Sequence, residues 1–322
     1  MIGGGEQSLH QRRYLCHKHI LDLTKLLCYK IERLPSRLAL QGVQLLEREP
    51  RNGGSFSDVY FGQYADTTVA LKRLRVVQHN YHRFTAKKRF IREVLIWANL
   101  RPHSNVVPLL GTDAANFTHA PCIVLPWMRN GNLSSYLTNP ANAAECNSPR
   151  MQQIASGLAY LHQHHIAHGD MRAANILLDH NLIAQITDFG LSRLASDYVT
   201  QVSSDGRAPY WLAPELHAPD VFGLEHARPR AEADVYAYAC VCFELFTGSP
   251  PYSRLTAVQI WNRMQRGERP LRPVFHFTGH RMSDELWRVV EQCLSFRLHE
   301  RPLSHALAED LLLIEYACDD GM

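Results

Sequence analysis

The 322-residue chain changes its sequence pattern once, near residues 128–131. Before this point, short runs rich in Val, Tyr and Leu fill residues 43–74 and are interrupted by Gly53-Gly54 and Ala65-Asp66, which predicts hairpins of antiparallel strands. Between residues 43 and 128, helical spacing appears once, over residues 86–100. Two further strands are predicted at 108–110 and 123–125.

After this point the chain becomes mostly helical. Ser148-Pro149 has the residue types that open a helix, a capping side chain followed by a first-turn proline. Helices are predicted at 150–164, 232–247, 255–266 and 283–295. The fold class is therefore α+β, and a chain of this length makes either two domains of about 150 residues or one domain with two lobes.

Composition excludes several classes of protein. Lysines and arginines number 34 and aspartates and glutamates 31, so the net charge of +3 does not indicate a nucleic-acid partner. No uncharged apolar stretch reaches about 18 residues, so no membrane span is expected. Eight cysteines without a C-x-x-C pair predict reduced thiols in the cytoplasm, with the nucleus as the alternative.

An amphipathic helix is predicted at residues 15–34, before every motif described below. Ile20, Leu23, Leu27 and Ile31 recur at steps of three and four, and Pro35 is expected to end the helix. This apolar stripe needs a partner, which is the rest of the chain, a partner helix or an upstream segment. We expect the stripe to dock on the rest of the chain or to mark a truncation.

A glycine-containing loop stands between two predicted strands at residues 52–62, and Lys72 follows on the next strand. Such a loop lets backbone N–H groups approach phosphates, and a lysine on the next strand adds a positive charge. Two of the three glycine positions of a G-x-G-x-x-G loop hold Asn52 and Ser57, and only Gly54 is kept. Taken alone, this segment fits a plain hairpin turn equally well.

Three short strings follow in a fixed order: His168-Gly-Asp170-Met-Arg-Ala-Ala-Asn175, Asp188-Phe-Gly190 and Ala213-Pro-Glu215. In their order and spacing the chain resembles the eukaryotic protein kinases over roughly residues 42–314. The resemblance implies a bilobal kinase fold, with an antiparallel sheet and one main helix in the lobe at 42–128 and a larger helical lobe at 129–314. Residues 1–41 then form an extension and 315–322 a short tail.

The resemblance also implies ATP and Mg²⁺ as cofactors and a role for each motif residue. Lys72 would hold the α- and β-phosphates and pair with Glu93, while Asp170 would accept the proton of the substrate hydroxyl. Arg172 stands two residues further on and joins the catalytic set. Asn175 and Asp188 would hold the metal. Ten positions would bind the nucleotide: Asn52, Gly54, Ser57, Val59, Ala70, Lys72, Leu125, Trp127, Met128 and Leu177.

Two supporting contacts follow from the same resemblance. Glu215 would pair with Arg301, and Asp234 would accept hydrogen bonds from the backbone of the catalytic loop.

Gly169 stands where many kinases carry the arginine that binds a phosphorylated activation loop. We therefore expect activity without phosphorylation of the loop at residues 192–204.

The identity of the acceptor hydroxyl is left open by the motifs. Arg172-Ala-Ala and Trp211 are tyrosine-kinase-like, whereas the loop from Arg207 to Tyr210 lacks the proline and basic residue common in tyrosine kinases. The mixture resembles the tyrosine-kinase-like group, in particular fungal kinases with an H-G-D catalytic loop, whose members mostly modify serine and threonine. The prediction is a serine/threonine kinase of protein substrates. The alternatives are a tyrosine or dual-specificity kinase and a pseudokinase scaffold.

Overall fold

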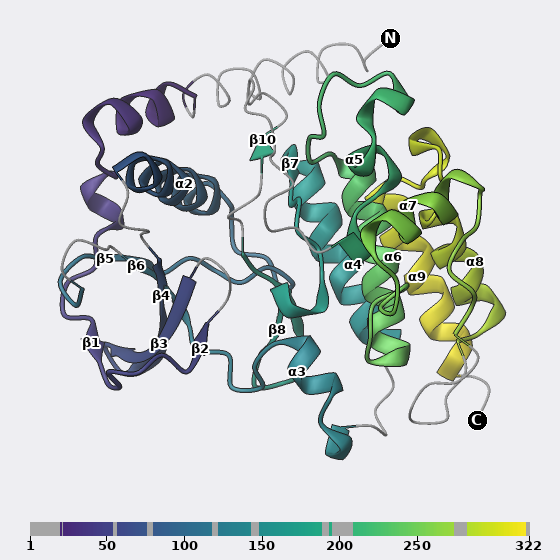
Figure 1. Cartoon of the computed structure of the whole chain (residues 1–322). Coiled ribbons are helices and arrows are strands. Elements are labelled where there is room, and N and C mark those ends of the chain that lie inside the picture. Colours follow the sequence, from purple (N-terminus) through teal and green to yellow (C-terminus); the bar gives the residue numbers. More distant parts are fainter. Residues whose placement is uncertain are drawn as a thin grey trace, which may run out of the picture. The chain divides into compact units, whose positions relative to one another are not determined.

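A computed structural model describes residues 20, 22–53, 57–75, 80–117, 122–142, 148–188, 193–194, 209–273 and 282–319. The chain forms two units (Figure 1), which we call the sheet unit (1–100 with 109–127) and the helical unit (101–108 with 128–322). The chain leaves the sheet unit after Trp127, at the edge of the region where the sequence pattern changes. The two-lobed organisation predicted from the sequence is thus confirmed.

The sheet unit contains one antiparallel sheet with the strand order β1-β3-β4-β6-β5, and β2 pairs with β3. A two-residue turn at Ala65-Asp66 joins the two longest strands, with φ of 48° at Ala65. The sheet core contains Val43, Tyr60, Val69, Leu71, Cys122 and Val124. The strands are β1 (Gln44–Leu45), β2 (Asn52–Gly53), β3 (Ser57–Tyr64), β4 (Thr67–Leu74), β5 (Gly111–Asp113) and β6 (Cys122–Pro126).

The strand predicted at 108–110 is wrong by three residues, because β5 begins at Gly111. Pro108 has no N–H to donate to a ladder. Gly111 also admits a close approach of the segment before β1: a Cβ on Gly111 would lie 2.7 Å from the carbonyl oxygen of Leu38. Leu38 is the last residue of the short helix η1 (Ser36–Leu38), and the Leu40 N–H then donates to Thr112 O at 2.9 Å.

Helix α2 (Asn80–Ala98) lies in the sheet unit and begins six residues before the predicted start at 86. Its apolar positions Phe90, Ile91, Val94 and Leu95 are buried, at spacings of one, three and four residues. Glu93 lies between them on the same helix and is 1% exposed. Helix α2 therefore places the Glu93 carboxylate in the buried interior of the sheet unit.

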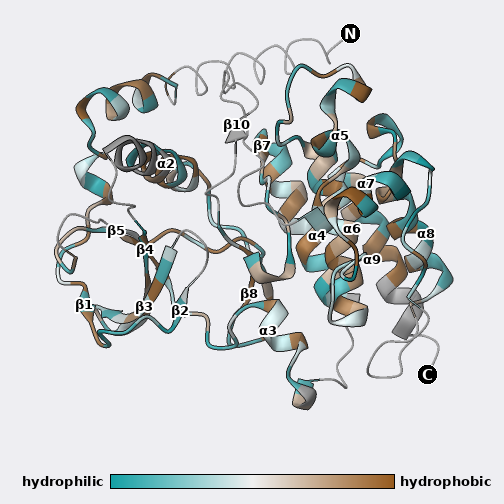
Figure 2. Cartoon of the chain, in the orientation of Figure 1, coloured by the Kyte–Doolittle hydropathy of each residue, from teal (hydrophilic) through white to brown (hydrophobic). Residues whose placement is uncertain are grey.

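The helical unit is built around α6 (Ala231–Thr247), whose residues are buried on every side from Ala233 to Phe246. Figure 2 shows the hydrophobic residues along α6 and its neighbours. Gly248 ends the helix with φ of 69°, a left-handed conformation that favours glycine. The other helices are α3 (Leu133–Leu137), α4 (Ser148–Gln163), α5 (Pro214–His217), α7 (Ala257–Gln265), α8 (Asp284–Cys293) and α9 (Ser304–Asp319).

All four helices predicted for this unit are present, and α9 was missed. It packs against α4 and extends beyond residue 314, where the sequence predicts a tail. Leu307 and Leu311 are buried while Leu312 and Leu313 are exposed, so the apolar pattern of this helix is mixed. Two small strand pairs complete the unit, β7 (Ile166–Ala167) with β10 (Arg193–Leu194) and β8 (Ile176–Leu178) with β9 (Ala184–Ile186).

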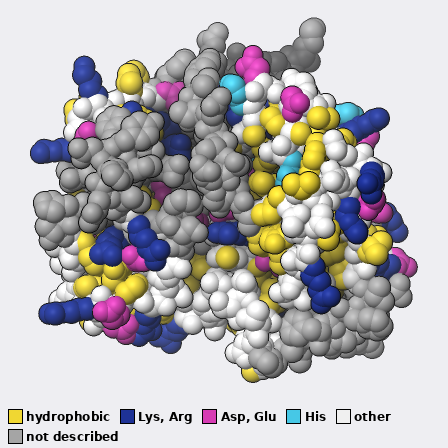
Figure 3. Space-filling model, in the orientation of Figure 1, with side chains coloured by type: hydrophobic (Ala, Val, Ile, Leu, Met, Phe, Trp, Pro, Cys, Tyr) yellow, Lys and Arg dark blue, Asp and Glu magenta, His cyan; other side chains and the backbone are white. Residues whose placement is uncertain are grey.

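Short 3₁₀ helices fill several connections of the helical unit. They are η2 (Pro140–Asn142), η3 (Ala173–Asn175), η5 (Pro209–Trp211), η6 (Pro219–Phe222) and η7 (Leu298–Glu300). On the face in Figure 3, acidic and basic side chains of the described residues are interspersed, and hydrophobic ones gather around α5 and α7. Within the described residues, no helix combines the length and the apolar character that crossing a membrane requires.

The N-terminal helix covers residue 20 and residues 22–31 of the described chain. It ends at Ile31, before the predicted stop at Pro35, because the next residue, Glu32, has a left-handed φ of 53°. The residues that this helix buries are Lys25 and Cys28. The predicted apolar stripe is exposed instead, with exposed fractions between 53% and 66% at Ile20, Leu23, Leu27 and Ile31. The expectation that this stripe docks on the rest of the chain is therefore wrong: the helix docks through its opposite face.

Candidate functional site

The register of the sheet places six of the residues predicted to bind nucleotide on one face. Directly opposed residues of antiparallel strands share a face. Val59 lies opposite Lys72, and Ala70 lies opposite Leu125. Positions that alternate with them on β3, β4 and β6 form the core on the other face. The six residues are Asn52, Ser57, Val59, Ala70, Lys72 and Leu125.

Lys72 forms the predicted pair with Glu93. The Lys72 Nζ atom lies 2.7 Å from Glu93 Oε1, and the two side chains are 9% and 1% exposed. Strand β4 supplies the lysine and helix α2 the glutamate. A short, buried pair of this kind fixes the position of the ammonium group, which is the condition for holding a phosphate at one place.

Trp127 and Met128 lie where the chain passes from the sheet unit to the helical unit. The backbone N–H of Trp127 donates to Thr68 O at 3.1 Å, and its indole ring meets the Phe61 ring edge-on at 4.8 Å between centroids. Trp127 is thus engaged by the sheet unit. Nucleotide binding by Trp127 stays a prediction. Met128 belongs to the helical unit, where its carbonyl accepts from Gly131 N–H at 3.1 Å. Gly54 lies outside the described residues.

A second charged group near the glycine loop was not predicted. The buried Asp58 carboxylate accepts from Arg73 at 3.0 Å and from Arg75 at 2.6 Å. Hydrogen bonds from Arg75 and then Arg73 hold the pKa of Asp58 below its usual value. The signal was present in the sequence, because a turn at residues 65–66 sets Asp58 opposite Arg73. This pair anchors β3 beside Ser57.

In the helical unit, Asp170 is held by Asn175. The Asn175 amide Nδ2 donates to Asp170 Oδ2 at 2.8 Å and to the Asp170 backbone carbonyl at 2.7 Å. Arg172 Nε lies 3.5 Å from the same Oδ2 atom. From the other side, Asp170 N–H donates to His168 Nδ1 at 3.2 Å. The carboxylate of Asp170 is therefore oriented by its neighbours and carries a cation beside it.

The residues predicted to hold the metal are connected through the backbone. Thr187 N–H donates to Asn175 O at 3.0 Å, and Asp188 follows Thr187 with φ of 68°. Aspartate tolerates this left-handed conformation better than most residues, and such strain is common at functional sites. Because Asn175 donates through its nitrogen, its amide oxygen is the atom suited to a cation. A carboxylate and an amide oxygen fit Mg²⁺, which takes few protein ligands and completes its shell with phosphates and water.

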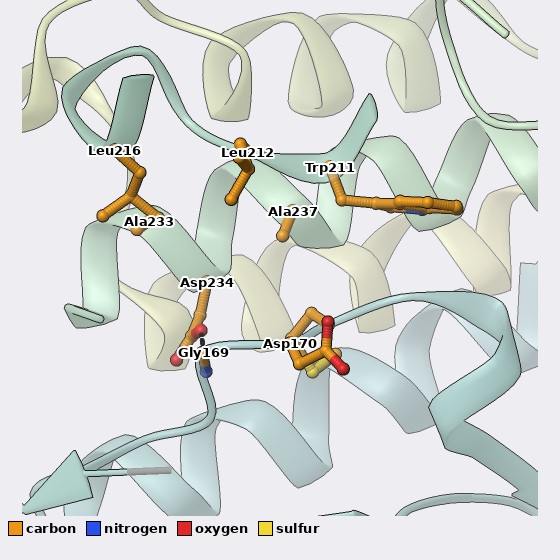
Figure 4. A pocket seen from close by; sticks show the side chains of 9 residues that line it. Gly169, Asp170, Trp211, Leu212, Leu216, Ala233, Asp234 and Ala237 are labelled. Atoms are coloured by element: carbon orange, nitrogen blue, oxygen red, sulfur yellow. Dashed lines mark hydrogen bonds between the residues drawn. The ribbon is translucent and has the colours of Figure 1, made fainter. Parts of the chain in front are cut away.

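Asp234, at the start of α6, holds the backbone of the catalytic loop as predicted. Its carboxylate accepts from His168 N–H at 2.7 Å and from Gly169 N–H at 2.8 Å, the latter shown as a dashed line in Figure 4. His162 Nε2 lies 3.0 Å from the same carboxylate. Gly169 has φ of 80°, a conformation that glycine adopts without strain. The residue before Asp170 thus suits the geometry of the loop.

The predicted pair of Glu215 and Arg301 is also present. The guanidinium group contacts both carboxylate oxygens at 2.7 and 2.8 Å, and neither side chain is exposed. Leu177, predicted to bind nucleotide, is half-buried on β8 opposite Gln185. Phe189 and the loop at 192–204 contain residues outside the described chain, so the expectation about loop phosphorylation stays a prediction.

Glu244 is a buried acid near the catalytic loop that the sequence analysis did not identify as part of the site. Its Oε2 atom accepts from Ala173 N–H at 2.9 Å and from the Trp211 indole N–H at 2.7 Å. Trp211 and Asp170 line one small pocket (Figure 4). Burial raises the pKa of Glu244 to about 7 against the effect of these hydrogen bonds. Glu244 therefore connects the Trp211 turn with the loop that carries Asp170 and Arg172.

The raised pKa of Glu244 predicts a specific dependence of stability on pH. Since the folded protein binds this proton more tightly than the unfolded chain, stability falls as pH rises from about 4.5 to about 7. Glu244→Gln removes the charge and keeps an acceptor oxygen. Relative to wild type, we expect the variant to gain up to about 3 kcal/mol between pH 4.5 and pH 8. Urea unfolding at both pH values measures this; an equal pH dependence in the two proteins would contradict it.

Comparisons with known proteins agree with this geometry. The family model described as protein tyrosine and serine/threonine kinase matches residues 49–311. Serine/threonine-protein kinase STY46 of Arabidopsis thaliana is 33% identical over 227 residues, which cover 68% of this chain and 36% of that protein. Tyrosine-protein kinase SPK-1 of Girardia tigrina is 31% identical over 238 residues, 71% of this chain and 46% of that protein.

A third relative matches a longer part of this chain. Mitogen-activated protein kinase kinase kinase 1a of Physcomitrium patens is 29% identical over 250 residues, which cover 77% of this chain and 31% of that protein. The chain thus spans between about a third and a half of the length of these curated relatives. The similarity covers both units.

Proposed function

The chain belongs to the protein tyrosine and serine/threonine kinase family, and on this basis we propose that it transfers the γ-phosphoryl group of ATP to protein hydroxyl groups, mainly of serine and threonine. The observation that carries the proposal is the orientation of Asp170 by Asn175 in a chain that also buries the Lys72–Glu93 pair. A binding scaffold has no physical need for both arrangements. The pseudokinase alternative is therefore the weaker one.

Each residue has a task that its environment supports. Lys72, fixed by Glu93, would hold the α- and β-phosphates of the nucleotide, and Asn175 with Asp188 would hold Mg²⁺, which neutralises phosphate charge when it is bound. Asp170 would orient the acceptor hydroxyl and accept its proton. Phosphoryl transfer depends on alignment and charge neutralisation more than on covalent help, so a few fixed charges are sufficient.

Arg172 supports the proposal and adds a question about the acceptor. Its Nε atom lies 3.5 Å from Asp170 Oδ2, close enough to neutralise charge that develops beside the transferred group.

The acceptor hydroxyl is indicated less directly, because the name of one relative indicates serine/threonine specificity and that of another tyrosine specificity. The tyrosine alternative also has Trp211 in its favour. We propose serine and threonine because the mixed motifs resemble the tyrosine-kinase-like group.

A cytoplasmic location is proposed on the basis of the thiols. Five cysteines of the described chain are buried thiols: Cys28, Cys122, Cys240, Cys242 and Cys293. Burial raises the pKa of Cys122 to about 12, as it does for Cys242, so these thiols are inert and serve the core. Cysteines kept as thiols in the core fit a reducing compartment.

The test is transfer of ³²P from γ-labelled ATP to a mixed peptide array in the presence of Mg²⁺. We expect wild type to label peptides and Asp170→Asn to reduce the rate by about 10²–10⁴-fold, because the hydroxyl loses its proton acceptor. Asp220→Asn, an exposed change in the same unit, is the matched control and should retain the wild-type rate.

Two outcomes would contradict the proposal: no label from wild type, or equal label from wild type and Asp170→Asn. Phosphoamino-acid analysis of the products then identifies the acceptor. We expect phosphoserine and phosphothreonine. Phosphotyrosine alone would replace the proposed acceptor class while leaving the transfer itself established.

A further inference from the structure

The backbone at Gly53, on the strand that enters the glycine loop, lies directly against the side chain of Arg75. A Cβ atom on Gly53 would lie 2.8 Å from Arg75 Nη2 and 3.3 Å from Asp58 Oδ1. Glycine admits this close approach because it has no Cβ atom. The guanidinium group of Arg75 therefore rests on the main chain of β2, the first strand of the loop.

Arg75 reaches this position across three adjacent strands. It directly follows β4, and β3 lies between β4 and β2. On the middle strand, Asp58 lies opposite both Gly53 and Arg73. Its Oδ1 atom accepts from Arg75 Nε at 2.8 Å and from Arg75 Nη2 at 2.6 Å, and its Oδ2 atom accepts from Arg73 at 3.0 Å. The carboxylate of Asp58 thus fixes the guanidinium group that covers Gly53.

The far end of this series of contacts is held in the sheet core. The Cζ atom of Arg73 lies 4.9 Å from the centre of the Tyr60 ring and 4.9 Å from that of Phe117. Cation–π attraction holds a guanidinium group in such a place. Tyr60 is a core residue, and the side chain of Asp58 is 9% exposed, where salt screens an ion pair less than at the surface. The contacts from Arg73 through Asp58 to Arg75 therefore link the backbone of β2 to the core.

These contacts lie on the reverse of the sheet face that carries Lys72. Side chains along a strand alternate between the two faces. Arg73 and Asp58 oppose each other on one face, while Lys72 and Val59 oppose each other on the other. Arg75 stands two residues beyond Arg73 and bonds the same carboxylate. From this face, Arg75 can act on a nucleotide only through the backbone of the loop.

Strand β2 needs such support because it is only two residues long. Its described pairing with β3 consists of Asn52 opposite Val59 and Gly53 opposite Asp58. We propose that Arg75, held by Asp58, is a positioning residue that fixes the first strand of the glycine loop where the loop backbone binds the phosphates of ATP. This inference rests on the proposed function, in which the chain uses ATP.

Equilibrium binding of ATP and of adenosine separates this role from a general effect on folding. Adenosine lacks the phosphates that the loop backbone would contact. In the presence of Mg²⁺, Arg75→Ala should raise the Kd of ATP by about tenfold and change the Kd of adenosine by less than about twofold. Arg37→Ala, which changes an exposed arginine of the same unit, is the matched control and should bind both ligands like wild type. Equal weakening of both ligands by Arg75→Ala would overturn the positioning role.

Gly53→Ala gives a second test that leaves all three charged residues in place. The added methyl group takes the space of Arg75 Nη2, so it should displace the guanidinium group and raise the Kd of ATP by about threefold. Combined with Arg75→Ala, it should add nothing further, because the methyl group then has room. Additive effects of the two changes would overturn the contact as the cause.

The same titrations distinguish this inference from the proposed function. A wild-type protein that binds neither ATP nor adenosine would overturn the proposed function and this inference with it. A wild-type protein that binds ATP, beside an Arg75→Ala variant of unchanged ATP affinity, would overturn this inference alone.

Discussion

Replacing Lys72 with methionine is expected to reduce phosphoryl transfer by about 10²–10³-fold, because the charge that holds the phosphates is lost while the length of the side chain is kept. The same change leaves the Glu93 carboxylate, 1% exposed, without the ammonium group 2.7 Å away. Breaking a buried pair on one side destabilises a protein by about 3–5 kcal/mol. Initial rates with labelled ATP and urea unfolding measure the two effects separately.

The sheet unit offers a matched control for this experiment. Lys87 and Glu32 form a pair of the same residue types at 2.5 Å, with exposures of 44% and 45%. Lys87→Met should cost less than about 1 kcal/mol because solvent screens an exposed pair.

A double variant separates stability from catalysis. Lys72→Met with Glu93→Leu removes both buried charges and should recover most of the lost stability without recovering transfer. A Lys72→Met protein that transfers phosphate at the wild-type rate would show that the assigned role of Lys72 is wrong.

The contacts that could be predicted from the sequence are those that the family resemblance implied through short motif strings, although the contacting residues lie far apart in the chain. Asp234 bonds the backbone at His168 and Gly169, and Glu215 contacts Arg301, as the resemblance implied. The division of the chain at residues 127–128 follows from periodicity, because a half-buried strand and an amphipathic helix differ in repeat.

What could not be predicted depends on tertiary packing. Glu244 lies in a helix that is buried on every side, so no periodicity singles out the face that meets Trp211 and Ala173. For the N-terminal helix, the apolar face was recognised but was wrongly expected to be the face that docks. The spacing of apolar residues alone does not reveal that the docked face contains Lys25 and Cys28.

The pair of Glu215 and Arg301 is expected to have the largest effect on stability in the helical unit. Arg301 donates to both oxygens of Glu215, to Ser295 O at 2.9 Å and to Glu232 O at 2.9 Å, and is fully buried. It thus connects α5 and α6 with the segment before α9. Arg301→Met removes these bonds and leaves a buried carboxylate, so we expect a loss of about 3–5 kcal/mol.

This loss is large against a total stability of about 5–15 kcal/mol for a folded protein. An exposed pair of the same residue types, Arg263 with Glu268 at 3.6 Å, is the control, and Arg263→Met should change the unfolding free energy by less than about 1 kcal/mol.

The double change Glu215→Leu with Arg301→Met decides what the pair contributes. If the cost of Arg301→Met comes from an uncompensated charge, the double variant should unfold at a higher urea concentration than the single one. The carboxylate left by the single change should also take up a proton, because burial without a cation raises the pKa of an acid. The single variant should then regain stability at low pH, and the double variant should not. Equal urea midpoints for the single and double variants would instead assign the loss to the hydrogen bonds that Arg301 makes to Ser295 and Glu232.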